Sequence, residues 1–242
     1  MSASSLKNES VLIVGGSAGI GLEVARIALE LGARVHIASR GTTTSSPALL
    51  DATYHVCDAK SEAALTELFA ELGQIDHVVM TMHESAARLG IDTTADKMNL
   101  AAVSEYTDGK FWSQYRVVKA ALPHLAPKGT LTFTSGVASR ATMANHSAIS
   151  AVNASIEACA RQLAKELAPR RVNVVAPGVT ATTTYDAMDP ELKEEFVAKI
   201  TAVVPLQRIA EADEIALAYI FAMQCGYLTG TVLDASGGQL VA

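Results

Sequence analysis

The sequence has few cysteines, no cluster of positive charge and no long hydrophobic run, and each shortage excludes a class of protein. Its cysteines, Cys57, Cys159 and Cys225, are odd in number and widely spaced, so they provide neither a disulfide framework nor a metal-ligand cluster. No segment approaches the ~20 apolar residues that a membrane-spanning helix needs. The first ten residues lack the charged and apolar regions of a signal peptide. We expect a cytoplasmic protein without a metal site or a membrane partner.

The charge balance argues against nucleic acid as a partner. The formal net charge is −6, and no basic block offsets it. The chain of 242 residues, half of them hydrophobic, can fill the core of one large α/β domain. A small molecule is therefore the expected partner.

Residues 11–21 (VLIVGGSAGIG) are the most informative stretch. Four apolar residues, 11–14, are typical of a strand buried on both faces, and a helical pattern begins at Ile20. Between them, Gly15, Gly19 and Gly21 allow a sharp turn and leave the backbone N–H groups open to a pyrophosphate. A glycine turn without a ligand is the alternative, but the β-α-β context, with a second strand at 34–38, favours a dinucleotide site.

Strands and helices alternate along the whole chain, with no repeat and no linker. This order predicts one doubly wound parallel sheet, a Rossmann fold, over residues 1–242. A binding crevice is expected at the carboxyl ends of the strands. The predicted strands are 11–14, 34–38, 53–56, 77–81, 130–134, 172–175 and 231–233. The first predicted helix begins near residue 20, and the others span 61–72, 104–125, 147–167, 190–200 and 211–223.

In this order the chain resembles the short-chain dehydrogenase/reductase family over essentially its whole length. The resemblance rests on the glycine turn, on Asp58 in VCDA, on Ser135 in FTSG, on Pro177-Gly178 with Thr182, and on LTGTVLDASGG near the C-terminus. In the family, the residue matching Asp58 contacts adenine, and the one matching Ser135 is the catalytic serine. Those matching Pro177-Gly178 and Thr182 line the nicotinamide side of the site. The resemblance thus implies a nicotinamide-dependent oxidoreductase that forms homodimers or homotetramers.

The end of the second predicted strand indicates which cofactor binds. An acidic residue there would accept the ribose hydroxyls, whereas this chain has Ser39-Arg40, a hydroxyl and a guanidinium that can bind a 2′-phosphate. NADP(H) is therefore favoured as the cofactor. The alternative is that Arg40 is only a solvated charge on a loop. The expected cofactor-binding residues are Gly15, Ser17, Gly19, Ile20, Gly21, Ser39, Arg40, Asp58, Asn153, Pro177, Gly178 and Thr182.

The catalytic positions depart from the family. Counting back from LAKEL at the end of the helix 147–167 places the family's Tyr on Ile149 and its Lys on Asn153. The same procedure places the family's Asn, on the preceding long helix, on Lys110. Ile149 cannot donate a proton, so another residue must act as the acid.

Two histidines are candidates for that acid. His146 lies about one helical turn before Ile149, and His83, followed by Glu84, lies at the carboxyl end of a central strand. The alternative for His146 is that it only caps the helix, and the alternative for His83 and Glu84 is that they lie in a solvated loop. The expected catalytic residues are Ser135, Lys110, His146, His83 and Asn153.

The segment 179–205 is expected to be the substrate loop. Tyr185, Met188, Phe196 and Leu206 lie in or beside it and suggest an apolar lid over an apolar substrate, although Phe196 fits core packing equally well. The first functional hypothesis is an NADP(H)-dependent oxidoreductase acting on a carbonyl, alcohol or conjugated C=C. A redox-neutral cyclase, isomerase or lyase that keeps a bound cofactor, and a non-catalytic cofactor-binding protein, remain alternatives.

Overall fold

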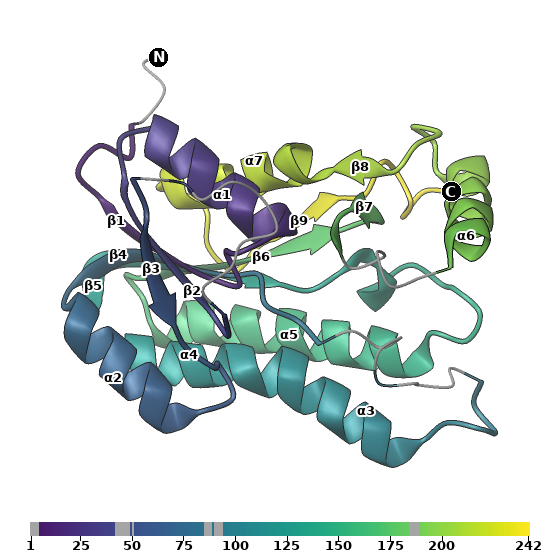
Figure 1. The fold of residues 1–242 in the computed structure, drawn as a ribbon, viewed down its shortest axis with the longest axis horizontal. Helices are drawn as coiled ribbons and strands as arrows, with labels where there is room; N and C mark the ends of the chain where they lie inside the picture. The colour runs from purple at the N-terminus through teal and green to yellow at the C-terminus, as the bar shows by residue number, and fades with distance from the viewer. Residues whose placement is uncertain (1–4, 42–48, 50, 85–88, 90–93, 184–188) are drawn as a thin grey trace.

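The computed structural model of the chain describes residues 5–41, 49, 51–84, 89, 94–183 and 189–242. Seven parallel strands form one sheet in the order β3-β2-β1-β4-β5-β6-β9, and helices cover both of its faces (Figure 1). The predicted doubly wound parallel sheet is confirmed. The strands are β1 (Ser10–Val14), β2 (Arg34–Ser39), β3 (Thr53–Val56), β4 (Ile75–Met80), β5 (Leu125–Thr134), β6 (Arg171–Pro177) and β9 (Val232–Ala235), and β7 (Thr180–Ala181) pairs with β8 (Ala210–Glu211) outside the sheet.

The sheet is buried on both sides because its central strands are apolar throughout. All five residues of β1 are buried, and so are five of the six in β4, as expected for strands covered on both faces. One core lies under α1 and α7, and the other lies under α2, α4 and α5. The helices are α1 (Gly19–Glu30), α2 (Glu62–Leu72), α3 (Leu100–Thr107), α4 (Ser113–Ala121), α5 (Ser147–Glu166), α6 (Pro190–Val203) and α7 (Ala212–Gln224).

The predicted helix 104–125 is wrong at both ends and in its middle. Helix α3 begins earlier, a π-helical turn η1 (Asp108–Trp112) follows it, and α4 ends at Ala121. Pro127 and Gly129, two residue types that ordinarily end a helix, lie instead inside β5. The register between β4 and β5 shifts between Ile75 and His77, and this irregularity accommodates the proline.

The strand order reverses between β2-β1 and β4, so the carboxyl ends of β1 and β4 flank a topological switch point. Ligands of open α/β sheets bind in the crevice at such a point. In this chain the glycine turn follows β1, and Met82, His83 and Glu84 follow β4. The fold therefore places the expected functional segments at one edge of the sheet.

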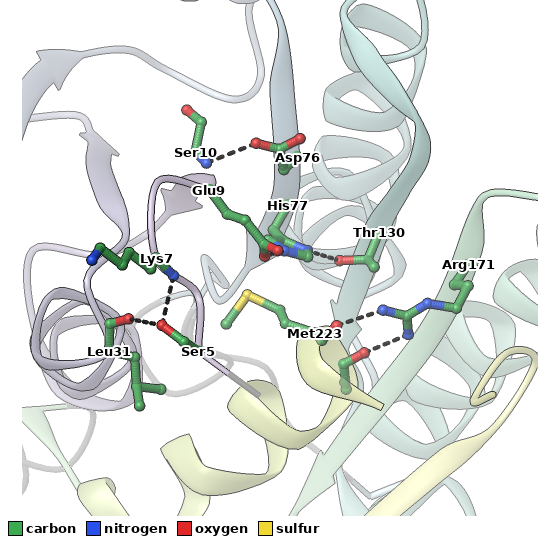
Figure 2. A network of polar contacts seen from close by, with 11 residues as sticks. Ser5, Lys7, Glu9, Ser10, Leu31, Asp76, His77, Thr130, Arg171 and Met223 are labelled. Carbon is green, nitrogen blue, oxygen red and sulfur yellow. Dashed lines mark hydrogen bonds and ion pairs between the residues drawn. The ribbon is translucent and has the colours of Figure 1, made fainter. Parts of the chain in front are cut away.

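The opposite edge of the sheet holds a polar network around His77 (Figure 2). The His77 ring lies 2.6 Å from Glu9 Oε2 through Nε2 and 2.7 Å from Thr130 Oγ1 through Nδ1. Asp76 accepts the backbone N–H of Ser10 at 2.9 Å. These contacts join the starts of β1 and β4 to the middle of β5. Burial lowers the pKa of His77, although Glu9 opposes that shift.

Candidate functional site

A cavity of about 580 Å³ opens at the carboxyl ends of β1, β2, β4, β5 and β6. It extends from the glycine turn to Lys110 and Ser135. A cavity of this size is large enough for a ligand. Of the expected site residues, it is lined by Gly15, Ser17, Gly19, Ile20, Gly21, Ser39, Arg40, Asp58, His83, Lys110, Ser135, Pro177, Gly178 and Thr182.

The glycine turn has the geometry of a dinucleotide cradle. Gly15 has a φ of +92°, and a Cβ there would lie 2.5 Å from the backbone N of Met82. A Cβ at Gly21 would lie 2.4 Å from Thr81 Oγ1, and one at Gly19 would lie 3.2 Å from Thr182. Glycine is therefore required where β1 passes into α1, and the first N–H groups of α1 stay open to an anion. The residues present fit a pyrophosphate.

Three charged side chains meet beyond the end of β2. Arg40 is 61% exposed, and its Nη1 lies 3.7 Å from Glu84 Oε2. Lys60 Nζ approaches the same oxygen to 3.2 Å. Ser39 Oγ donates to the carbonyl of Gly41 at 2.5 Å. Arg40, which the sequence associates with a 2′-phosphate, thus lies beside a second cation, Lys60, from the segment after β3.

Lys110 enters the cavity from the π-helical turn η1. The residue is 8% exposed, and its Nζ donates to the backbone oxygen of Ser135 at 3.1 Å. Burial alone lowers the pKa of Lys110 to about 8, since low polarity disfavours the ammonium. A π-turn inside a helix often marks a functional residue. The pKa of Lys110 therefore lies close enough to neutrality for proton transfer.

Ser135 lies in the cavity wall, but its hydroxyl is bound to α5. Ser135 Oγ donates to Glu157 Oε1 at 3.0 Å, and Ser139 Oγ donates to the same oxygen at 2.5 Å. Arg140 pairs with Glu157 at 3.2 Å and donates to Asp234 at 2.7 Å. Glu157 itself is buried. The hydroxyl of Ser135 thus belongs to a closed network that joins β5, α5 and β9.

Gly136, not Ser135, is the residue that faces Asn153. A Cβ at Gly136 would lie 3.4 Å from both Oδ1 and Nδ2 of Asn153. Successive side chains of extended backbone point to opposite sides, so Ser135 and Gly136 face different surroundings. Asn153 Nδ2 donates to the carbonyl of Ile149 at 3.0 Å, and its buried Oδ1 has no hydrogen-bond partner in the described part of the chain. Asn153 itself does not line the cavity, although the neighbouring Gly136 does.

The two histidines occupy different places. His83 lies on the cavity wall, and although its side chain is exposed there, the surrounding protein and the Lys110 charge lower its pKa to about 4. It is therefore neutral near pH 7. His146 is the N-cap residue of α5, with Nδ1 2.8 Å from the Ala144 carbonyl, and does not line the cavity. The structure does not bring His146 together with Lys110.

Tyr106 was not identified from the sequence, although it stands four residues before Lys110 and thus repeats a Tyr-x-x-x-Lys spacing on another helix. Its ring packs with Val152 and Ile149, beside the position that the family's tyrosine would occupy. Burial raises the pKa of Tyr106 to about 12, and the residue does not line the cavity. The same spacing therefore does not recreate an activated tyrosine.

The segment expected to cover the substrate is only partly described. Tyr185 and Met188 lie outside the described residues. Helix α6 has no buried residue, and Leu206 beyond it is 62% exposed. Phe196 is half-buried on this helix. Core packing is thus the weaker account of Phe196.

Within residues 5–41, 49, 51–84, 89, 94–183 and 189–242, no group of three His, Cys, Asp or Glu side chains could hold a metal ion. None of the helices in these ranges is long and apolar enough to cross a membrane.

Known proteins resemble this chain over nearly all of its length. A family model described as enoyl-(acyl carrier protein) reductase matches residues 14–239. The short-chain dehydrogenase/reductase ATR9 of Stachybotrys chlorohalonatus is 31% identical, and the match covers 98% of each chain. A small-chain dehydrogenase solved in complex with NADPH is 32% identical, with a TM-score of 0.85 over 98% of this chain and 100% of that one. The MalC reductase/Diels-Alderase of Malbranchea aurantiaca is 26% identical, with a TM-score of 0.84 over 98% and 97%.

Proposed function

This chain belongs to the short-chain dehydrogenase/reductase family of oxidoreductases, and from that premise we propose that it is specific for NADP(H). Its substrate is a carbonyl, an alcohol or a conjugated C=C of a small, largely apolar molecule, and its proton donor is Lys110 rather than a tyrosine. Observations at the two ends of the cavity support the proposal.

The cofactor assignment is supported by the end of the cavity beyond β2. Arg40 and Lys60 provide two cations there, and the glycine turn provides open N–H groups. An adenosine 2′-phosphate would be held by Arg40, which suits bidentate phosphate contacts. The similar small-chain dehydrogenase was solved with NADPH.

The observation that carries the proposed chemistry is the buried ammonium of Lys110 in the cavity wall. The bound nicotinamide supplies or accepts the hydride. Lys110 Nζ donates a proton to the oxygen or carbon that is reduced, and its pKa of about 8 keeps it protonated at neutral pH. The charge also polarises the carbonyl, a role that the Ser135 hydroxyl cannot take while it donates to Glu157.

The test is a panel of aldehydes, ketones and enones incubated with purified protein and NADPH. We expect NADPH absorbance to fall as reduced product forms, and Lys110→Met to slow this by ~10²- to 10⁴-fold. Lys119→Met is the matched control, since Lys119 is exposed on α4, pairs with Glu62 and does not line the cavity. Equal losses in both variants would contradict the role of Lys110.

A second candidate is a redox-neutral cyclase, isomerase or lyase that keeps the cofactor as part of its pocket. It is supported by Ile149 and Asn153, where the family has its Tyr and Lys, and by Gly136 beside Asn153, since none of the three carries an ionisable side chain. The similar MalC protein is described as both a reductase and a Diels-Alderase. This candidate predicts that product forms equally well with NADP⁺ and without loss of NADPH.

We further propose that residues 1–242 act as one domain, with 179–205 as the substrate loop, and that the chain forms a homodimer or homotetramer. Trp112 is 48% exposed and Tyr115 is 37% exposed, and with Phe111 they form an aromatic group on η1 and α4. Burying such a group favours association. Sedimentation that showed only a 25.3 kDa species at micromolar concentration would contradict this proposal.

A further inference from the structure

Glu84 lies where it can compete with a phosphate. The residue follows β4, and its side chain is 12% exposed. Its Oε2 lies 3.2 Å from Lys60 Nζ and 3.7 Å from Arg40 Nη1. One carboxylate oxygen is thus shared by the two cations that the proposed function assigns to the adenosine end of the cavity.

The backbone of η1 makes room for this arrangement. A Cβ at Gly109 would lie 2.7 Å from Glu84 Cβ and 3.3 Å from Oε2. Any larger residue at 109 would push Glu84 away from its present position. The carboxylate is therefore held between η1 on one side and Arg40 and Lys60 on the other, rather than extending freely into solvent.

The carboxylate of Glu84 contributes a large share of the negative charge in the cavity lining. The described cavity lining contains three cations, Arg40, Lys60 and Lys110, and two carboxylates, Glu84 and Asp58. The cavity is positive by one charge with Glu84 present and by two without it. Asp58 is exposed and accepts the backbone N–H of Lys60 at 3.0 Å, so it does not replace Glu84 between the two side chains.

We propose that Glu84 is a built-in counter-ion that sets the affinity for an adenosine 2′-phosphate by competing for Arg40 and Lys60. In the structure Glu84 offsets one of the two positive charges and pairs with both cations, and it must release them before a phosphate can pair with them. A ligand with a free 2′-hydroxyl needs no such release. Glu84 is therefore a specificity-determining residue that lowers the preference for phosphorylated ligands below what Arg40 and Lys60 alone would give. The inference rests on the proposed NADP(H) specificity.

The experiment measures direct binding of two adenosine fragments, adenosine 2′,5′-bisphosphate and 5′-AMP, by calorimetry. Neither fragment carries a nicotinamide, so no catalytic step enters the result. We expect Glu84→Gln to bind the bisphosphate about tenfold more tightly than wild type and to bind 5′-AMP within about twofold of wild type. The gain should shrink at high salt, because salt screens charge pairs in a partly open site.

Glu30→Gln is the matched control. Glu30 is an exposed carboxylate at the end of α1 that pairs with Arg26 at 2.6 Å, so its loss changes the net charge equally without touching the cavity. This variant should bind both fragments as wild type does. In Arg40→Ala, adding Glu84→Gln should give a smaller gain, because one of the two released cations is missing.

The outcomes distinguish a failure of the role of Glu84 from a failure of the NADP(H) proposal. Unchanged or weaker bisphosphate binding in Glu84→Gln would overturn the inference and would make Glu84 a support that orients Arg40. Equal tightening for both fragments would overturn it as well, since that would be a general charge effect. If wild type binds both fragments equally and Arg40→Ala changes neither, the NADP(H) proposal itself fails. A wild-type preference with no effect of Glu84→Gln refutes only the role of Glu84.

Discussion

Replacing Lys110 by Met should make the protein more stable and much less active. The pKa of Lys110 falls from 10.5 to about 8 on folding. At ~1.36 kcal/mol per unit, this means that the buried ammonium costs about 3 kcal/mol at neutral pH. The Met variant also loses the hydrogen bond to the Ser135 carbonyl, which contributes about 1 kcal/mol. The net gain is about 2 kcal/mol.

For a chain of this size, a gain of that magnitude raises Tm by roughly 4–8 °C. The assay is thermal unfolding of both proteins by circular dichroism at pH 7, paired with the rate of NADPH-dependent reduction. Met fills the volume of the lysine stem, so the packing of η1 should remain. A gain in Tm together with a ~10²-fold or larger loss of turnover is the signature of a functional charge kept at a cost in stability.

The pH dependence gives this prediction its sharpest test. Because the folded pKa of Lys110 lies below its unfolded value, the unfolded chain holds more protons between pH 8 and 10.5. The unfolding free energy of wild type therefore rises relative to the Met variant across that window. The difference in Tm should be constant below pH 8 and should close toward pH 10.5. A lower Tm in the variant, or a gap independent of pH, would refute the account of Lys110.

Three other predictions concern separate parts of the molecule. Arg40→Ala should reduce the preference for NADPH over NADH by roughly 10- to 100-fold, since a charge-assisted contact is lost; equal affinities in wild type, measured by fluorescence titration, would contradict it. Burial lowers the pKa of His77 below its ordinary value, so the unfolded chain binds more protons below about pH 6.5 and stability should fall as the pH drops from there. His77→Gln should flatten that dependence of Tm, and an unchanged slope would count against it. Ile149→Tyr alone should not restore ordinary ketone reduction, whereas adding Asn153→Lys and Gly136→Ser should, because φ at Gly136 is 173° and a Cβ there would make only ordinary van der Waals contact with residue 153. Brisk reduction by the single variant would argue that the missing partners are not needed.

The fold could be predicted because burial on both faces leaves a direct mark on the sequence. Continuous apolar runs such as 11–14 become central strands, and the helices between them carry apolar faces. The boundary near residue 125 could not be predicted, since Pro127 and Gly129 ordinarily end elements. Only the register shift against β4 shows how β5 accommodates them.

Part of the site could be predicted for a similar reason. Glycines that lack room for a Cβ, such as Gly15 and Gly21, are visible as a spaced motif. The direction of a hydroxyl is not visible in the sequence, because adjacent side chains of extended backbone point to opposite sides. The sequence therefore favoured Ser135, while the backbone turns position 136 toward Asn153. The partner of Ser135, Glu157, lies 22 residues away and is identified only by the packing of α5.

The most direct measurement of the central claim is the fate of the hydride. NADPH carrying deuterium at the transferable position is incubated with wild type and a substrate that it converts, and the product is weighed by mass spectrometry. We predict that the product contains one deuterium and that one NADP⁺ forms per turnover. The reduction rate should fall as the pH rises past the pKa of Lys110, about 8. An unlabelled product that forms at the same rate with NADP⁺ would contradict it and would show that the chain catalyses a redox-neutral reaction.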